Sequence, residues 1–343
     1  MSWELAGHLL DGRSPLVVIG EIGLNHGGNP ERALALVDAA AAGRASVVKL
    51  QTLRGDRLVD PSAPAPAHVR VSSLQQFFAG FELDAAAHRA VAQRARALGM
   101  GFVSTPFDED AVAMLVDVGV DALKVASGDL THHRLIATAA RTGVPIIMST
   151  GMADLAEIDA AVDCARRHGA ERLALLHCVS AYPTPDDQQQ LGSIPVLAAR
   201  YDVPVGLSDH SQCPLAAAIA TALGATLYER HLVTGPDDDA IDAPVSSTPD
   251  QLARVVRDAA SVRRAVGERR KQPVAAELVN RHASRRGVFA VRALQPGEVL
   301  TEGDVRMLRR ETAVAASAWP TIMGRRVRRA VPAGIALTPD DLE

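Results

Sequence analysis

The chain has 343 residues, of which 48% are apolar and only 3% aromatic, and its formal net charge is −4. This length fits one large domain with a smaller one, and the scarcity of aromatic residues favours helix-rich α/β packing over a β-sandwich. A slightly acidic chain gives no electrostatic reason to bind nucleic acid or an anionic membrane, so we expect neither as a partner.

The alternation of short and long segments from residue 17 onward predicts the fold. Short β-branched segments are predicted as strands at residues 17–23, 47–52, 101–106, 122–127, 145–150, 173–178, 204–209 and 226–233. Segments rich in Ala and Leu are predicted as helices at residues 30–43, 84–99, 108–118, 132–142, 154–168, 191–201, 214–224 and 249–267. Eight βα units in about 250 residues indicate a (β/α)8 TIM barrel. A doubly wound sheet is the alternative, but the glycines after the first strand lack its Gly-x-Gly-x-x-Gly spacing.

The barrel is predicted to span residues 1–268 and to be followed by a second domain. Residues 269–283 are polar and contain Pro273, which is typical of a linker. Residues 284–343 carry short alternating segments broken by Pro-Gly and Pro-Ala-Gly turns, which predicts a small, mostly β domain. Within the barrel, residues 53–83 form a long excursion, which on the catalytic face is usually a lid or a wall.

Cysteine usage and the N-terminal residues indicate a cytoplasmic protein. Cys164, Cys178 and Cys213 are widely spaced, so neither a disulfide framework nor a zinc knuckle is expected. The N-terminus lacks the basic start and long apolar segment of a signal peptide. No stretch reaches the roughly 18 apolar residues of a membrane span.

Two histidines, His210 and His231, follow predicted strands of adjacent βα units. The strand ends of a TIM barrel open on one face, where active sites of this architecture are built. Neutral imidazoles on neighbouring strands can bind one divalent metal ion and leave positions for water and substrate. The alternative is that both are ordinary buried or interface histidines.

Other polar side chains occupy the same kind of position. Lys49 and Lys124 lie inside apolar strands, where an ammonium group needs a partner anion, either a bound phosphate or carboxylate or a carboxylate of the protein. Glu21 ends the first strand and is a candidate general base or a structural brace for Lys49. Hydroxyl groups follow four further strands, where with relaxed backbone amides they would form a ring of anion donors: Thr105, Ser127, Ser149 and Ser208.

Several motifs, ordered along nearly the whole chain, together resemble one family. They are Gly20-Glu-Ile-Gly-Leu-Asn-His-Gly-Gly28, Val48-Lys-Leu-Gln-Thr52, Phe102-Val-Ser-Thr-Pro-Phe-Asp108, Lys124-Val-Ala-Ser-Gly-Asp129, Ser149-Thr-Gly-Met152, Leu176-His-Cys-Val-Ser-Ala-Tyr-Pro-Thr-Pro185 and Gly206-Leu-Ser-Asp-His210. This combination resembles the N-acetylneuraminate (sialic acid) synthase family, which also covers legionaminate, pseudaminate and spore-coat polysaccharide synthases. The segment from Arg285 to Gly334 resembles the C-terminal antifreeze-like (SAF) domain of that family.

The resemblance implies an enzyme that condenses phosphoenolpyruvate (PEP) with the open-chain aldehyde of an amino sugar, giving a 2-keto-3-deoxy acid and phosphate. By this analogy, His210 and His231 would hold a divalent metal ion, Mn²⁺ in the first place and Mg²⁺ or Co²⁺ as alternatives. Glu21, with Lys49 and Lys124 as the other catalytic residues, would manage the water that attacks C2 of PEP. The PEP-binding residues would be Lys49, Thr105, Lys124, Ser127, Ser149 and Ser208.

The same resemblance implies acceptor positions at Gln51, Tyr182, Asp242 and Arg310. Arg310, next to Arg309, would reach in from the small domain of the partner subunit of a homodimer. Departures from the family pattern fall mostly on this acceptor side: Ala181 stands for Asn, Asp129 for Glu, Ile241-Asp-Ala243 for Pro-Asp-His and Arg310-Glu-Thr312 for Arg-Pro-Gly. The identity of the acceptor therefore stays open. So do two other functions, a metal-dependent aldolase or lyase that uses pyruvate and a sugar-binding barrel without catalysis.

Overall fold

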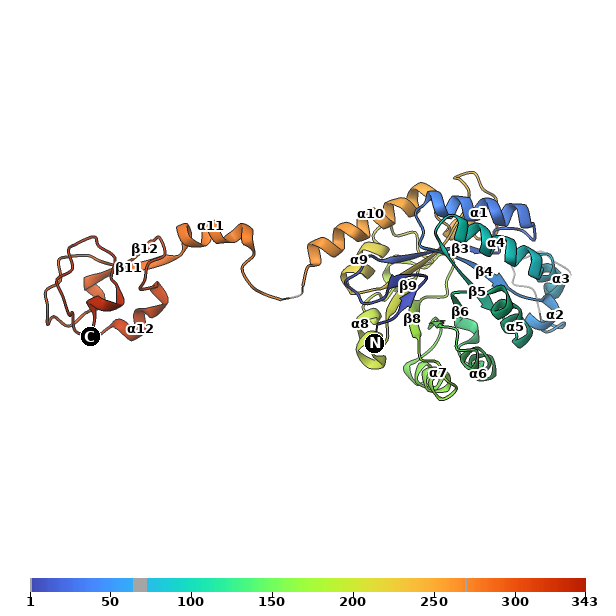
Figure 1. Cartoon of the computed structure of the whole chain (residues 1–343), viewed down its shortest axis with the longest axis horizontal. Coiled ribbons are helices and arrows are strands. Elements are labelled where there is room, and N and C mark those ends of the chain that lie inside the picture. The colour runs from blue at the N-terminus through green and yellow to red at the C-terminus, as the bar shows by residue number, and fades with distance from the viewer. Residues whose placement is uncertain (1, 64–72, 269) are drawn as a thin grey trace. The chain divides into compact units, whose positions relative to one another are not determined.

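The structure, a computed structural model, describes residues 2–63, 73–268 and 270–343 (Figure 1). It divides into two compact units, Met1–Gly267 and Glu268–Glu343. Among the described residues, no helix combines the length and the apolar character needed to cross a membrane.

Eight parallel strands of the first unit close into a barrel with the order β10-β3-β4-β5-β6-β7-β8-β9. All eight predicted strands are present, and the predicted (β/α)8 fold is confirmed. Some strands end earlier than predicted because a tight turn follows, as where the 3₁₀ turn Ser127–Asp129 replaces the expected strand end. The strands are β3 (Val17–Gly23), β4 (Val47–Thr52), β5 (Gly101–Pro106), β6 (Ala122–Val125), β7 (Ile146–Ser149), β8 (Leu173–Cys178), β9 (Val205–Ser208) and β10 (Leu227–His231).

Helices cover the outside of the barrel (Figure 1). Side-chain caps fix several helix starts at the predicted places; Asp84, Asp108 and Asp154 each accept a hydrogen bond from a backbone N–H of the first turn. The helices are α1 (Pro30–Ala42), α4 (Ala85–Ala97), α5 (Glu109–Val118), α6 (His133–Arg141), α7 (Leu155–Arg167), α8 (Ser193–Tyr201), α9 (Ala216–Ala222) and α10 (Pro249–Val266). In the excursion after β4 lie α2 (Gly55–Leu58) and α3 (Leu74–Ala79); residues 64–72 of the predicted lid lie outside the described residues.

Two apolar layers hold the barrel together. The larger one packs the helices against the outward faces of the strands. The smaller one fills the interior near the strand starts, where Val17, Val47 and Leu227 meet Trp3 and Leu5 of an N-terminal hairpin, β1 (Glu4–Leu5) and β2 (His8–Leu9). This hairpin was not predicted, because its strands are only two residues long. It closes the amino end of the barrel, so polar interior positions are left at the carboxyl end.

The second unit has a small apolar core of its own. Two antiparallel strands, β11 (Arg286–Ala290) and β12 (Val305–Arg309), and the short α12 (Trp319–Ile322) surround buried residues such as Val288, Leu300 and Leu337. The segment predicted as a linker is partly helical, since α11 spans Ala275–Ser284. The prediction missed this helix because it rested on the polar residues around Pro273, whereas the apolar side chains of α11, such as Leu278 and Val279, are exposed and belong to no core.

We predict that Gly206→Ala destabilises the barrel. A methyl group at Gly206 would lie 2.4 Å from the carbonyl oxygen of Leu227 and 2.7 Å from the Leu176 side chain. Overpacking of this kind typically costs about 1–3 kcal/mol in the free energy of unfolding. Urea denaturation measures the loss, with Gly235→Ala as the control, since its methyl would meet nothing within 4 Å. A midpoint for Gly206→Ala equal to that of the wild type would contradict the prediction.

Candidate active site

A cavity of about 400 Å³ lies at the carboxyl ends of the barrel strands. Its volume is within the usual range for small-molecule sites. All predicted site residues line it except Asp242 and Arg310: Glu21, Lys49, Gln51, Thr105, Lys124, Ser127, Ser149, Tyr182, Ser208, His210 and His231. The structure therefore brings together side chains that lie as much as 210 residues apart in the chain.

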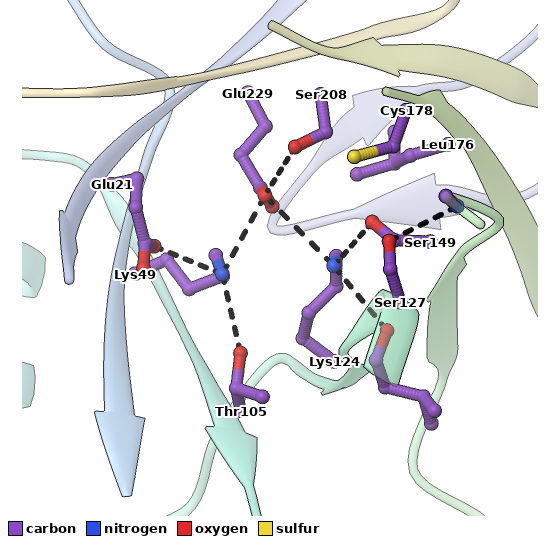
Figure 2. A network of polar contacts seen from close by, with 12 residues as sticks. Glu21, Lys49, Thr105, Lys124, Ser127, Ser149, Leu176, Cys178, Ser208 and Glu229 are labelled. Atoms are coloured by element: carbon purple, nitrogen blue, oxygen red, sulfur yellow. Dashed lines mark hydrogen bonds and ion pairs between the residues drawn. The ribbon is translucent and has the colours of Figure 1, made fainter. Parts of the chain in front are cut away.

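Two buried lysines share one glutamate at the centre of the cavity (Figure 2). Nζ of Lys49 lies 3.0 Å from Oε2 of Glu21 and 3.6 Å from Oε1 of Glu229. Nζ of Lys124 lies 3.8 Å from the same oxygen of Glu229. All four residues are at most 5% exposed, and their charges balance, which offsets part of the cost of burying them.

These ion pairs also match the structural alternatives, because each lysine has a protein carboxylate as partner and Glu21 braces Lys49. Ion pairing alone therefore does not identify an anion site. The use of lysine rather than arginine at these two positions adds information. The chain has three lysines among 36 basic residues, and two of the three lie in this cavity. Nearly all other basic residues of the chain are arginines, which indicates that these two positions require a compact ammonium group that three acceptors can approach.

Burial and mutual charge set the protonation of the four groups. Burial raises the pKa of Glu21 against the opposing effect of Lys49. Burial also favours a higher pKa for Glu229, but Lys124 and Lys49 outweigh it and lower that pKa. Burial lowers the pKa of Lys124. For Lys49 the effect of burial is outweighed by Glu21 and Glu229, which raise its pKa. Glu229 is therefore held ionised, whereas Glu21 is the carboxylate with the higher affinity for a proton.

Hydroxyl groups surround the two ammonium groups (Figure 2). Lys49 donates to Oγ1 of Thr105 at 3.2 Å, and Lys124 donates to Oγ of Ser149 at 2.6 Å. Ser208 donates to Oε1 of Glu229 at 3.0 Å, and Oγ of Ser127 accepts from the backbone N–H of Gly151 at 3.0 Å. This arrangement places donors on several sides of one cavity, as the binding of a compact anion requires.

The two histidines lie side by side, with ring centroids 5.6 Å apart. Burial, and then the neighbouring His231, lower the pKa of His210 to about 3, so this ring is neutral near pH 7. Nδ1 of His210 lies 3.3 Å from the carbonyl oxygen of Val179, which leaves Nε2 with its lone pair free to bind a cation. Nδ1 of His231 is buried without a hydrogen-bond partner. Two such imidazoles fit a divalent metal ion.

The remaining metal ligands would have to come from water or substrate. Over residues 2–63, 73–268 and 270–343, no group of three His, Cys, Asp or Glu side chains has the geometry to hold a metal ion. A two-histidine site of this kind keeps open positions, which is typical of catalytic rather than structural metals.

Each of the four predicted acceptor residues has different surroundings. Nε2 of Gln51 donates to Oε1 of Glu21 at 3.2 Å, and the ring of Tyr182 packs on His210 with centroids 4.2 Å apart. Oδ2 of Asp242 lies 3.5 Å from Nδ1 of His231, just outside the cavity lining. Arg310 belongs to the second unit, where it is exposed and its guanidinium lies 5.4 Å from the centre of the Phe289 ring.

The predictions missed Glu229 as a site residue, although its carboxylate is central to the network. The sequence contains a signal for it: residues two apart on a strand face the same side, and Glu229 lies two residues before His231. Cys178, at the end of β8, also lines the cavity, and its Sγ is 3.8 Å from Nδ1 of His210.

Known proteins resemble this chain over nearly its whole length. The N,N'-diacetyllegionaminic acid synthase of Legionella pneumophila is 31% identical over 335 residues, covering 95% of this chain and 94% of the relative. The pseudaminic acid synthase of Helicobacter pylori is 28% identical, covering 96% and 98%. The crystal structure of N-acetylneuraminic acid synthetase from Leptospira borgpetersenii superposes with a TM-score of 0.75 at 30% identity, covering 82% of this chain and 95% of that chain.

Residues 36–271 match the NeuB family, and residues 285–343 match the SAF domain. The first match spans more than half of the chain and includes most of the cavity residues. The resemblance predicted from the motifs is confirmed. The chain belongs to the NeuB family and carries a C-terminal SAF domain.

Proposed function

We propose that this enzyme condenses PEP with the open-chain aldehyde of an amino sugar and releases a 2-keto-3-deoxy acid and phosphate. One observation carries the proposal: the buried pair Lys49 and Lys124, ringed by hydroxyl groups, shares a cavity with two neighbouring histidines in a NeuB-family chain. The ammonium and hydroxyl groups suit the carboxylate and phosphate of PEP, and the histidines suit a metal ion beside the aldehyde.

Lys49 and Lys124 would bind PEP together with Thr105, Ser149 and Ser208. Charge-assisted hydrogen bonds of this kind are the stronger ones in proteins. Ser127 and the backbone of Gly151 would extend the same donor set. Glu229 touches both lysines and keeps them balanced in the absence of substrate, so an arriving anion meets ammonium groups that are already held in place.

Glu21 would act on water. In the reaction, C3 of PEP forms a bond with the aldehyde carbon, whose oxygen gains a proton, and water adds to C2 of PEP. The bond between C2 and the phosphate oxygen then breaks, which leaves a ketone at C2 and free phosphate. The proton lost by water needs an acceptor, and Glu21, whose pKa burial raises, is the carboxylate of the cavity with the higher affinity for that proton.

His210 and His231 would hold the divalent ion, with Mn²⁺ first and Mg²⁺ or Co²⁺ as alternatives. When bound, such an ion supplies Lewis-acid polarisation of the aldehyde oxygen. The chain's own contribution is to hold the two imidazoles close together and to keep His210 neutral, with the His210 ring covered by Tyr182.

The acceptor would enter from the side of Tyr182 and Gln51. Phe107 and Met152 also line the cavity and add apolar surface. Together with Ala181 in place of an amide, this lining favours an N-acylated sugar with fewer free hydroxyl groups than N-acetylmannosamine. Asp242, next to His231, would reach the acceptor from the loop that follows β10.

The second unit would complete the site of a partner subunit in a homodimer, with Arg310 contacting the acceptor. This role of Arg310 is supported by its exposure on a domain that the family match identifies as SAF. The domain has its own apolar core, so docking is not needed to compensate for a missing one. We also place the enzyme in the cytoplasm, in keeping with three free cysteines.

The function predicts phosphate release from PEP that depends on a sugar aldehyde. Purified protein with Mn²⁺ and a panel of N-acylated hexosamines, including 6-deoxy members, should release phosphate and form an acid that contains the three carbons of PEP. Phosphate assay and mass spectrometry detect both products. Turnover with pyruvate in place of PEP would indicate an aldolase instead, and binding of sugars without any turnover would indicate a non-catalytic barrel.

Lys124→Met should weaken PEP binding at least about tenfold, since a charge-assisted hydrogen bond contributes on the order of 1.5–3 kcal/mol. Titration calorimetry measures the affinity. Lys271→Met, which changes the exposed third lysine outside the cavity, serves as the control and should bind PEP like the wild type. Unchanged PEP affinity in a folded Lys124→Met protein would remove this lysine from the site.

Mixing two inactive variants tests the shared site. In a mixed dimer of Arg310→Ala and Glu21→Ala chains, one of the two sites combines an intact barrel with an intact small domain, so an equimolar mixture after full subunit exchange should regain about a quarter of the wild-type activity. Arg306→Ala, on the same domain, should stay active by itself. Subunits shown to have exchanged without recovery of activity would place Arg310 in its own chain's site or outside catalysis.

A further inference from the structure

A buried polar cluster lies behind the two histidines, on the outer face of the barrel wall. It consists of Asp209, Ser211, Tyr228 and Arg230. Asp209 and Ser211 flank His210 in the chain, and Arg230 precedes His231. Because side chains alternate along a strand, Glu229 and His231 face the catalytic cavity, whereas Tyr228 and Arg230 face outward toward α9 and α10.

The carboxylate of Asp209 is bound on both sides. Oδ2 accepts from the Tyr228 hydroxyl at 2.7 Å and lies 3.0 Å from Nη1 of Arg230. Oδ1 accepts from the backbone N–H and the hydroxyl of Ser211 at 2.8 and 2.7 Å. Arg230 also donates to the carbonyl oxygen of Ser211. The residues before and after His210 are thereby tied to β10, the strand that carries His231.

The imidazoles themselves have few restraints. The recorded polar contacts of His210 are the 3.3 Å contact with Val179 and the contact with Cys178, and Nδ1 of His231 has no hydrogen-bond partner. Tyr182 packs on the His210 ring, and the Asp242 carboxylate lies 3.5 Å from Nδ1 of His231, but neither contact joins β9 to β10. The separation of the two rings therefore depends mainly on the backbone at the ends of these strands. Asp209 and Tyr228 are each 3% exposed, so the bonds that join these ends are shielded from water and stronger for it.

We propose that Asp209, Tyr228 and Arg230 are positioning residues that set the spacing of His210 and His231 and thus the affinity for the divalent ion. They touch neither substrate nor metal and act through the main chain of the two strand ends. This inference rests on the proposed function, because it presupposes that the histidines hold a metal ion.

The chain contains a matched control. Tyr201 donates to Oδ1 of Asp159 at 2.8 Å, and Asp159 also pairs with Arg200, so the same three residue types contact one another between α7 and α8, at more exposed positions. That cluster lies among the outer helices and none of its members lines the catalytic cavity. Identical substitutions in the two clusters therefore separate metal positioning from general destabilisation.

The test measures Mn²⁺ binding to the full-length protein, using the electron paramagnetic resonance signal of the free ion, with His210→Ala as the reference for loss of the site. Tyr228→Phe should weaken Mn²⁺ binding at least about threefold and Arg230→Lys about tenfold, the lower end of what outer-shell partners of metal ligands contribute. Tyr201→Phe and Arg200→Lys should bind Mn²⁺ like the wild type. PEP affinity, measured by calorimetry, should stay within about twofold in all four variants.

A merely structural cluster would give a different result. Tyr228→Phe and Arg230→Lys would then lower the melting temperature measured in chelator, while the folded protein bound Mn²⁺ with wild-type affinity, and that outcome overturns the inference. If Arg230→Lys does not fold, Tyr228→Phe decides, because it keeps the ring and the Asp209–Arg230 pair. Failure of the wild type to bind Mn²⁺, by contrast, would overturn the metal part of the proposed function together with this inference.

Discussion

The burial of two ammonium groups inside the barrel is the constraint on which the site depends. An isolated lysine in such a place would lose its proton or unfold the strand that carries it. Here Glu229 lies within 4 Å of both Lys49 and Lys124, and Glu21 pairs with Lys49, so the charges cancel. A buried set of this kind is weak evidence for stability, since apolar residues of similar size would often serve as well. Stability alone is therefore a weak reason for this set, and the proposed function gives it another, the binding of PEP.

The closed barrel makes this arrangement possible by dividing its interior. Near the strand starts, an apolar cluster capped by Trp3 and Leu5 excludes water, and near the strand ends the interior becomes polar. A single strand can contribute residues to both the apolar and the polar part of the interior. In β9, Gly206 leaves room for Leu176 and Leu227 below, and Ser208 two residues later reaches Glu229 above. Stability and chemistry thus depend on neighbouring positions of the same strand.

Strand β10 shows how alternation connects the two faces of the wall. Glu229 and His231 face the cavity, and Tyr228 and Arg230 hold Asp209 on the outside. Both faces share one backbone, so an outward hydrogen bond can fix the position of an inward ligand. In the positioning role that we propose, the support for the histidines comes from this outer face.

The sequence by itself determined the eight βα units, because β-branched segments and capped helices follow local rules that tertiary contacts here do not override. It also placed Glu21, Lys49, Lys124 and the two histidines at strand ends, and the motifs named the family. Only the tertiary structure determined which carboxylate oxygens pair with which ammonium nitrogens. Glu229 became central because the closed barrel brings β10 within reach of Lys49 on β4, Lys124 on β6 and Ser208 on β9, a relation between distant segments that no local pattern contains. The N-terminal hairpin escaped prediction because its strands are too short to leave a periodic signal, and α11 escaped it because the polar, proline-containing segment before it is typical of a linker.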